Sequence, residues 1–190
     1  MGNFYVNYTL KGVTQQSVVA AMAGRIAAIS PVSGDAVVVF DSLSDKQDDK
    51  IITKLGAKLS GDLNAPCVAI LNHDDDILWY QLFDGGKLVD EYNSCPDYFD
   101  FDGRGTRRDP SGGDADKLCG LFGSKQVDSV EQILRVSAFD ENGYAFAFQR
   151  HADLFEELGL PSFAVGAGYT YMSGGELPEG LSESNLIRTT

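Results

Sequence analysis

The stretch His73-Asp74-Asp75-Asp76-Ile77-Leu78-Trp79-Tyr80-Gln81-Leu82-Phe83 joins an acidic cluster to a run of branched and aromatic residues. The turn signal Asp84-Gly85-Gly86-Lys87 follows, and then a second strand-like segment from Leu88 to Tyr92. Such runs on either side of a glycine turn are typical of a β-hairpin. The sequence therefore predicts a hairpin over residues 77–92 with a charged rim.

The residues before this hairpin show an order of strand and helix patterns. Alternation of apolar and polar residues indicates strands, and apolar spacings of three and four indicate helices. The expected strands span residues 3–10, 25–30, 36–40 and 67–71, and the strand at 36–40 should be buried because it is apolar on both faces. The expected helices span residues 14–23, with Thr14 as the cap, and 44–63. This β-α-β-β-α-β order is that of the ferredoxin-like arrangement. The sequence therefore predicts an α+β fold: a ferredoxin-like core with an added β-hairpin and a C-terminal α/β extension.

The chain divides into three segments that we expect to form one compact domain. Residues 1–93 form the ferredoxin-like core with its hairpin. Residues 94–113 form an acidic loop rich in glycine and proline, and loops of this length are either functional or mobile. Residues 114–190 form an extension packed on the core. Its expected helices span residues 114–123, 128–134 and 152–158, with a strand over 144–148 and a strand or loop over 163–171.

The chain is strongly acidic, with a formal net charge of −13 and an isoelectric point near 4.4. Residues 74–116 alone hold twelve Asp or Glu against four Lys or Arg. A surface of this sign repels nucleic-acid backbones and anionic membranes. We therefore expect neither of these partners, and a basic protein or a small ligand is favoured.

Targeting and cofactor motifs are not evident in the sequence. The longest uninterrupted apolar stretch, Val18–Ala23, is too short for a signal core or a membrane span. The three cysteines show no paired spacing, which favours ordinary thiols. Gly166-Ala167-Gly168 begins like a dinucleotide-binding fingerprint, but Tyr171 occupies the third glycine position. We therefore expect a cytoplasmic protein without a cofactor.

Aromatic residues beside charge suggest a contact surface. Trp79, Tyr80, Tyr92 and Tyr98 lie on or next to the predicted hairpin. Aromatic side chains are enriched at interfaces, and charge at the rim steers a partner of opposite sign. The first hypothesis is therefore a non-catalytic module that binds a protein or small ligand through these four residues.

A small-molecule enzyme is the alternative hypothesis. Its pocket would lie between the hairpin and the loop at 94–113, with His73 as the base and Asp97 or Asp114 as the orienting acid. This reading requires a deep cleft that holds His73 within hydrogen-bond reach of a carboxylate. The other histidine, His151, is expected at the surface or as a helix cap.

A calcium-stabilised domain is the third hypothesis. Asp100-Phe101-Asp102-Gly103 resembles the middle of a calcium loop, but Tyr98 falls at the first ligand position and excludes an EF-hand. An irregular site remains open. Its ligands would be Asp97, Asp100, Asp102 and Asp114. No other metal site is predicted.

Two strings of sequence resemble bacterial proteins of unknown function. They are Asn72–Leu82 and the pair Leu158–Pro161 with Gly166–Tyr169. This resemblance implies a bacterial, cytosolic setting, and it carries no activity, ligand or site.

Overall fold

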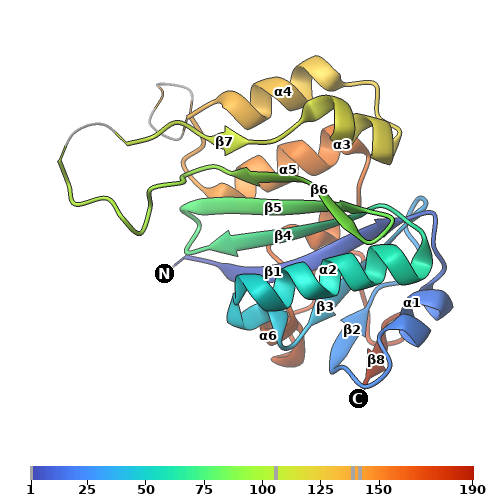
Figure 1. Cartoon of the computed structure of the whole chain (residues 1–190). Coiled ribbons are helices and arrows are strands. Elements are labelled where there is room, and N and C mark those ends of the chain that lie inside the picture. Colours follow the sequence, from blue (N-terminus) through green and yellow to red (C-terminus); the bar gives the residue numbers. More distant parts are fainter. Residues whose placement is uncertain (1, 105–106, 138–139, 141–142) are drawn as a thin grey trace.

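An eight-stranded antiparallel sheet forms the middle layer of the protein (Figure 1). The computed structural model describes residues 2–104, 107–137, 140 and 143–190. The strands are β1 (Phe4–Lys11), β2 (Ala27–Ile29), β3 (Ala36–Asp41), β4 (Cys67–His73), β5 (Ile77–Asp84), β6 (Lys87–Asn93), β7 (Ser111–Gly112) and β8 (Ile187–Thr189). Their order across the sheet is β7-β6-β5-β4-β1-β3-β2-β8. With 34% of residues in helices and 25% in strands, the fold is a mixture of the α+β type.

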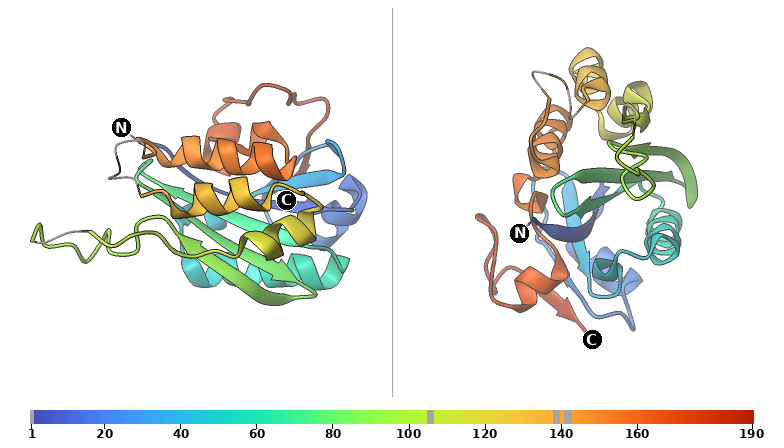
Figure 2. Two further views of the ribbon diagram at one scale, coloured as in Figure 1. Left: turned by 90° about the horizontal axis from the view of Figure 1, so that it is seen from above. Right: turned by 90° about the vertical axis from the view of Figure 1, so that its left-hand side faces the viewer.

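Helices cover both faces of the sheet (Figure 2). They are α1 (Gln15–Ala21), α2 (Asp49–Leu63), α3 (Ala115–Phe122), α4 (Val127–Arg135), α5 (Ala147–Leu158) and α6 (Tyr169–Ser173), with short 3₁₀ turns η1 (Ser44–Lys46) and η2 (Ser162–Ala164). Helices α1 and α2 pack on one face, and α3, α4, α5 and α6 pack on the other. The sheet therefore lies between two separate hydrophobic cores.

Strand β3 shows why the sheet needs cover on both sides. Val37 and Val39 belong to the core beneath α1 and α2, whereas Val38 and Phe40 belong to the opposite core. Successive side chains of a strand point to opposite faces, so an uninterrupted apolar run requires apolar neighbours on each face. This agrees with the expectation of a buried strand at 36–40.

The first two helices begin in different ways. Thr14 caps α1, because its hydroxyl accepts a hydrogen bond from the Ser17 amide at 3.1 Å, as predicted. The helix predicted from Ser44 begins later. Gln47 has a left-handed backbone (φ 59°), which ends the turn η1, and Asp48 then caps α2. Gln47 therefore lies at the sharp bend between η1 and α2, which we call the Gln47 corner.

The predicted strand over residues 144–148 is wrong, because α5 already begins at Ala147. The buried face of α5 carries Ala147, His151, Leu154 and Leu158, which recur at spacings of three and four. The alternating aromatic residues that suggested a strand, Tyr144, Phe146 and Phe148, run across the start of this helix. Strands β7 and β8 were not predicted, because two or three residues are too few to show a period.

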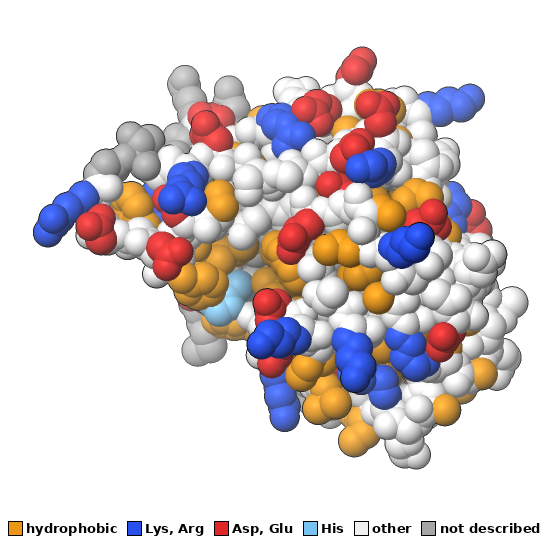
Figure 3. Space-filling view, in the orientation of Figure 1, with side chains coloured by type: hydrophobic (Ala, Val, Ile, Leu, Met, Phe, Trp, Pro, Cys, Tyr) orange, Lys and Arg blue, Asp and Glu red, His pale blue; other side chains and the backbone are white. Residues whose placement is uncertain are grey.

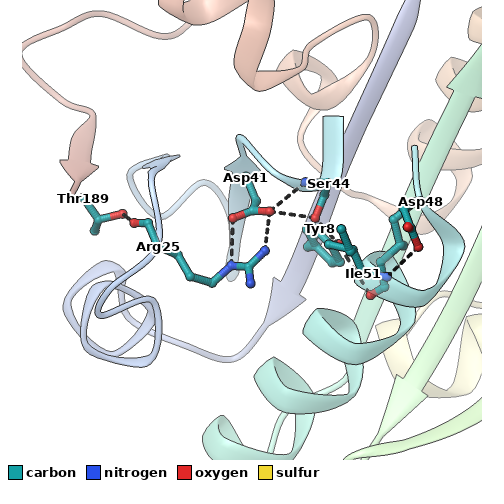
Figure 4. A network of polar contacts seen from close by, with 8 residues as sticks. Tyr8, Arg25, Asp41, Ser44, Asp48, Ile51 and Thr189 are labelled. Atoms are coloured by element: carbon teal, nitrogen blue, oxygen red, sulfur yellow. Dashed lines mark hydrogen bonds and ion pairs between the residues drawn. The ribbon is translucent and has the colours of Figure 1, made fainter. Parts of the chain in front are cut away.

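The buried carboxylate of Asp41 is the centre of a hydrogen-bond network at the β8 side of the sheet (Figure 4). Asp41 is fully buried and accepts from Arg25 Nε at 2.8 Å, Arg25 Nη2 at 2.6 Å and the Ser44 amide at 2.8 Å. The Ser44 hydroxyl also donates to Asp41 and lies 2.7 Å from Tyr8 Oη. Thr189 of β8 donates to the Arg25 carbonyl at 2.6 Å. One network thus ties β3, β1 and the last strand together.

Two expectations from the sequence concern membrane-spanning segments and the cysteines. Within the described residues, none of the helices combines the length and the apolar character that crossing a membrane requires. Cys67, Cys95 and Cys119 are free and buried, in agreement with the expectation of ordinary thiols.

Gly56 sets the distance between α2 and β5. A Cβ atom at this position would lie 2.3 Å from the Phe83 ring. Gly120 of α3 has open space at the corresponding position. We expect Gly56→Ala to lower the free energy of unfolding by about 1–3 kcal/mol, because overpacking outweighs the gain in helix propensity. Gly120→Ala should raise it by about 0.5–1 kcal/mol. Urea denaturation followed by circular dichroism measures both, and a stabilised Gly56→Ala variant would contradict the close packing.

Candidate functional site

Helix α2 leaves part of the sheet face uncovered beyond its N-terminal end. Thr53, one turn into α2, donates to Gln81 of β5 at 2.8 Å. On the same face of β5, Trp79 and Ile77 precede Gln81 in the chain, and they line a groove together with Asp49, the first residue of α2. The uncovered floor is a groove of about 350 Å³, which we call the Trp79 groove.

Two rows of paired residues build the floor of the Trp79 groove. Leu71 pairs with Trp79, which pairs with Asn93, and His73 pairs with Ile77 in the next row. Three strands therefore contribute to a single surface. The remaining lining side chains come from the corner between η1 and α2 and from the loop after β6: Lys46, Gln47, Asp49 and Phe99. In Figure 3 the groove lies open to solvent, with the histidine among hydrophobic side chains.

His73 is held by the Gln47 corner. The Gln47 amide nitrogen donates to the Asn72 carbonyl at 2.7 Å, and its oxygen lies 2.6 Å from His73 Nδ1. The left-handed backbone at Gln47 directs this side chain back over β4. The His73 ring is therefore fixed in one orientation.

Aromatic rings surround His73. Their centroids lie 4.9 Å away for Phe4, 5.2 Å for Phe99 and 6.0 Å for Tyr98, all with edge-to-face geometry. Phe99 is 75% exposed, the largest value among the exposed large hydrophobic side chains of the described chain. Such an exposed aromatic wall beside an apolar floor is a common feature of binding surfaces.

The four aromatic residues predicted as one contact face do not share a face. Tyr80 and Tyr92 are fully buried on the α5 side of the sheet and stack at a centroid distance of 5.4 Å. Trp79 points to the α2 side, and Tyr98 lies in the loop, where its hydroxyl donates to Asp76 at 2.9 Å. Strand alternation separates Trp79 from Tyr80. Of the four, Trp79 and Tyr98 lie at or next to the groove.

The acidic run Asp74–Asp76 forms the tight turn between β4 and β5. Asp74 and Asp75 both have left-handed backbones, with φ 55° and φ 60°. Asp75 is buried and accepts from the Asn72 side chain at 3.1 Å and from the Asn3 side chain at 2.9 Å. Part of the predicted charged rim is therefore structural, whereas Asp76 receives the Tyr98 hydroxyl at the surface.

The structure does not bring the predicted acid partners to His73. Asp97 accepts from the Arg108 amide at 3.1 Å, and Asp114 caps α3 by accepting from the Lys117 amide at 2.9 Å. The hydrogen bonds from the Lys117 amide and the Lys117 side chain lower the pKa of Asp114. Among the described residues, the only hydrogen-bond partner of the His73 side chain is Gln47. The dyad that the enzyme hypothesis requires is therefore not assembled.

The four candidate calcium ligands also have other contacts. Asp102 accepts from the Arg104 amide at 3.0 Å, and the Asp100 amide donates to the Asp97 carbonyl at 3.1 Å. Asp114 is occupied as a helix cap. Over residues 2–104, 107–137, 140 and 143–190, no three His, Cys, Asp or Glu side chains come together in a way that could hold a metal ion. We therefore derive no metal chemistry from this loop.

The sequence predicts His151 at the surface or as a helix cap. This prediction is wrong, because the side chain is fully buried. Its Nδ1 lies 2.8 Å from the Tyr5 hydroxyl, and among the residues that the structure describes Nε2 has no hydrogen-bond partner. Burial lowers its pKa to about 3, so the ring is neutral. The helix predicted from residue 152 begins at Ala147, so His151 lies within α5, on the helix face that packs against the sheet.

Sequence reasoning missed five further groove residues, because their roles depend on contacts that no local pattern shows. They are Lys46, Gln47, Asp49, Asn93 and Phe99. One signal was present, since a period of two places Leu71 with His73 and Ile77 with Trp79 on one face. That signal predicts the floor of the groove but not its walls.

Comparisons of the chain with protein-family models, with curated proteins and with solved structures find no significant match. The function is therefore argued from the geometry of the chain itself.

Proposed function

We propose that the protein is a non-catalytic binding module and that the Trp79 groove takes an extended segment of a basic protein partner. The observation that carries the proposal is the uncovered sheet floor between the end of α2 and the exposed ring of Phe99. An apolar side chain of the partner would lie on Trp79, and neighbouring basic side chains would face the carboxylates of Asp49, Asp76 and Glu91.

The composition of the groove supports an apolar anchor. Leu71, Ile77, Trp79 and Phe99 are the apolar side chains among its lining residues. The indole nitrogen of Trp79 already donates to Glu91 Oε1 at 2.9 Å, which leaves the face of the indole as its contact area. Aromatic and aliphatic anchors in such floors contribute most of the binding energy of interfaces.

The charge distribution supports a basic partner. Asp49 lines the groove, and Glu91 accepts the hydrogen bond of the Trp79 indole nitrogen. Asp74 and Asp76 belong to the turn next to His73. Lys46 is the only cation among the lining residues of the described chain. With a net charge of −13 on the whole chain, complementary charge accelerates association with a cationic segment.

Fluorescence titration tests this proposal, because Trp79 is the only tryptophan of the chain. The probe is a five-residue peptide in which lysine alternates with leucine, and the comparison probe has glutamate in place of lysine. We expect saturable quenching or a blue shift with the basic peptide alone. Because both partners are charged, the affinity should fall as the salt concentration rises.

Two variants locate the binding. Phe99→Ala removes a groove wall and should weaken binding about tenfold to a hundredfold, since burying such a side chain stabilises by about 1.5–3 kcal/mol. Phe146→Ala is the matched control, because Phe146 is 50% exposed and stacks on Phe148 outside the groove. Equal affinity for the acidic peptide, or equal effects of the two variants, would contradict the proposal.

The proposal includes the architecture of the first half of the chain, as a ferredoxin-like unit. Its support is the strand order β4-β1-β3-β2, with every neighbouring pair antiparallel and with α1 and α2 on one face. A cytoplasmic setting is supported by the three free thiols, since reducing compartments preserve them.

A further inference from the structure

The hydrogen-bond polarity of His73 is determined by its neighbours. The Asn72 carbonyl can only accept, so the atom of Gln47 that faces it at 2.7 Å is the amide nitrogen. The Gln47 oxygen therefore faces His73 Nδ1, and in the neutral form of the ring Nδ1 must carry the proton. Nε2 is then an acceptor, and it has no partner within the described chain. Gln47 is a positioning residue for this acceptor.

The same argument determines the polarity of Asn93. The Cys95 amide can only donate, so the Asn93 atom that lies 2.9 Å from it is the side-chain oxygen. The Asn93 side-chain nitrogen is therefore left as a donor, again without a partner in the described part of the chain. The groove thus presents one acceptor and one donor whose identities are fixed.

We infer that the Trp79 groove reads the backbone of its partner: His73 Nε2 accepts a peptide N–H and the Asn93 side-chain nitrogen donates to a peptide C=O. This inference rests on the proposed function. It adds a peptide group of the partner's backbone to the apolar and basic side chains that the proposed function already assigns to recognition. A ligand with only donors, such as an alkyl amine, would satisfy one of the two groups and leave the other unpaired.

The spacing of the two groups fits an extended segment. His73 on β4 and Asn93 on β6 are two strands and two residues apart, with Trp79 between them. Strand spacing of about 4.8 Å and a rise of about 3.4 Å per residue place their Cα atoms about 12 Å apart. At a rise of about 3.4 Å per residue, about three or four residues of extended peptide span this distance.

An ester scan combined with a variant tests the inference. Each peptide bond of the lysine–leucine peptide is replaced in turn by an ester, which removes the N–H and keeps the shape. At one position we expect binding to the wild type to weaken about fivefold, the usual effect of losing one hydrogen bond. In His73→Phe, which keeps an aromatic ring and lacks the acceptor, the same ester should cost nothing. The comparison is a double-mutant cycle across the interface.

The outcomes separate the inference from the proposed function. If the peptide does not bind the wild type at all, the proposed function fails. If the peptide binds but every ester has the same effect on both proteins, the backbone reading is wrong and the groove recognises side chains alone.

Nitrogen chemical shifts of the His73 ring give an independent test. The wild-type ring should show the tautomer with the proton on Nδ1, and Gln47→Met should release it toward the other tautomer. A wild-type ring with the proton on Nε2 overturns the inference, because the acceptor would then be absent.

Discussion

Replacing Asp41 with alanine should lower the free energy of unfolding by about 3–5 kcal/mol. Asp41 is fully buried, and its two carboxylate oxygens accept four hydrogen bonds from Arg25 and Ser44. The variant leaves the Arg25 guanidinium without its partner, although 24% of that side chain remains exposed. Guanidinium denaturation followed by circular dichroism gives the loss.

Asp62→Ala is the matched control for this prediction. Asp62 pairs with Lys58 at 2.6 Å on the surface of α2, and about half of each side chain is exposed. Exposed pairs of this kind contribute about 0.5 kcal/mol or less. Similar losses in the two variants would show that the buried network does not fasten the sheet as described.

Acid should destabilise the protein through His151. Because burial lowers its folded-state pKa from 6.5 to about 3, the unfolded state binds more protons between these values. Stability therefore falls as the pH decreases below about 6.5 and continues to fall until about pH 3. Between pH 7 and pH 5 this one group should cost about 2 kcal/mol.

His151→Gln isolates this contribution from that of the many carboxylates. The glutamine side chain does not titrate, and it can still hydrogen-bond to Tyr5. Unfolding free energies at pH 7 and pH 5 should differ by about 2 kcal/mol less in the variant than in the wild type. Parallel pH profiles would mean that His151 is not held neutral in the core.

Local patterns predicted the parts of the fold that depend on neighbouring residues. The Thr14 cap and the glycine turn between β5 and β6 are examples, since capping and turn chemistry act over a few residues. The strand predicted over residues 144–148 failed because its alternation was a coincidence at the start of a helix. The two short edge strands carried no detectable period.

The candidate site was only half predictable for a related reason. The aromatic run led to Trp79 and His73, and alternation could have excluded Tyr80 and Tyr92 from the surface. Gln47 was not predictable, because its role needs a left-handed corner placed over β4. Contacts between segments distant in sequence depend on packing, and residue patterns do not reveal them.

Chemical-shift mapping with the lysine–leucine peptide tests the central claim most directly. The claim predicts shifts at Leu71, His73, the Trp79 indole and Phe99, all in the Trp79 groove. The chain has a larger apolar hollow of about 690 Å³ on the other side of the sheet, lined by Phe148 and neighbouring residues. Shifts gathered around Phe148, with the Trp79 indole unchanged, would contradict the account.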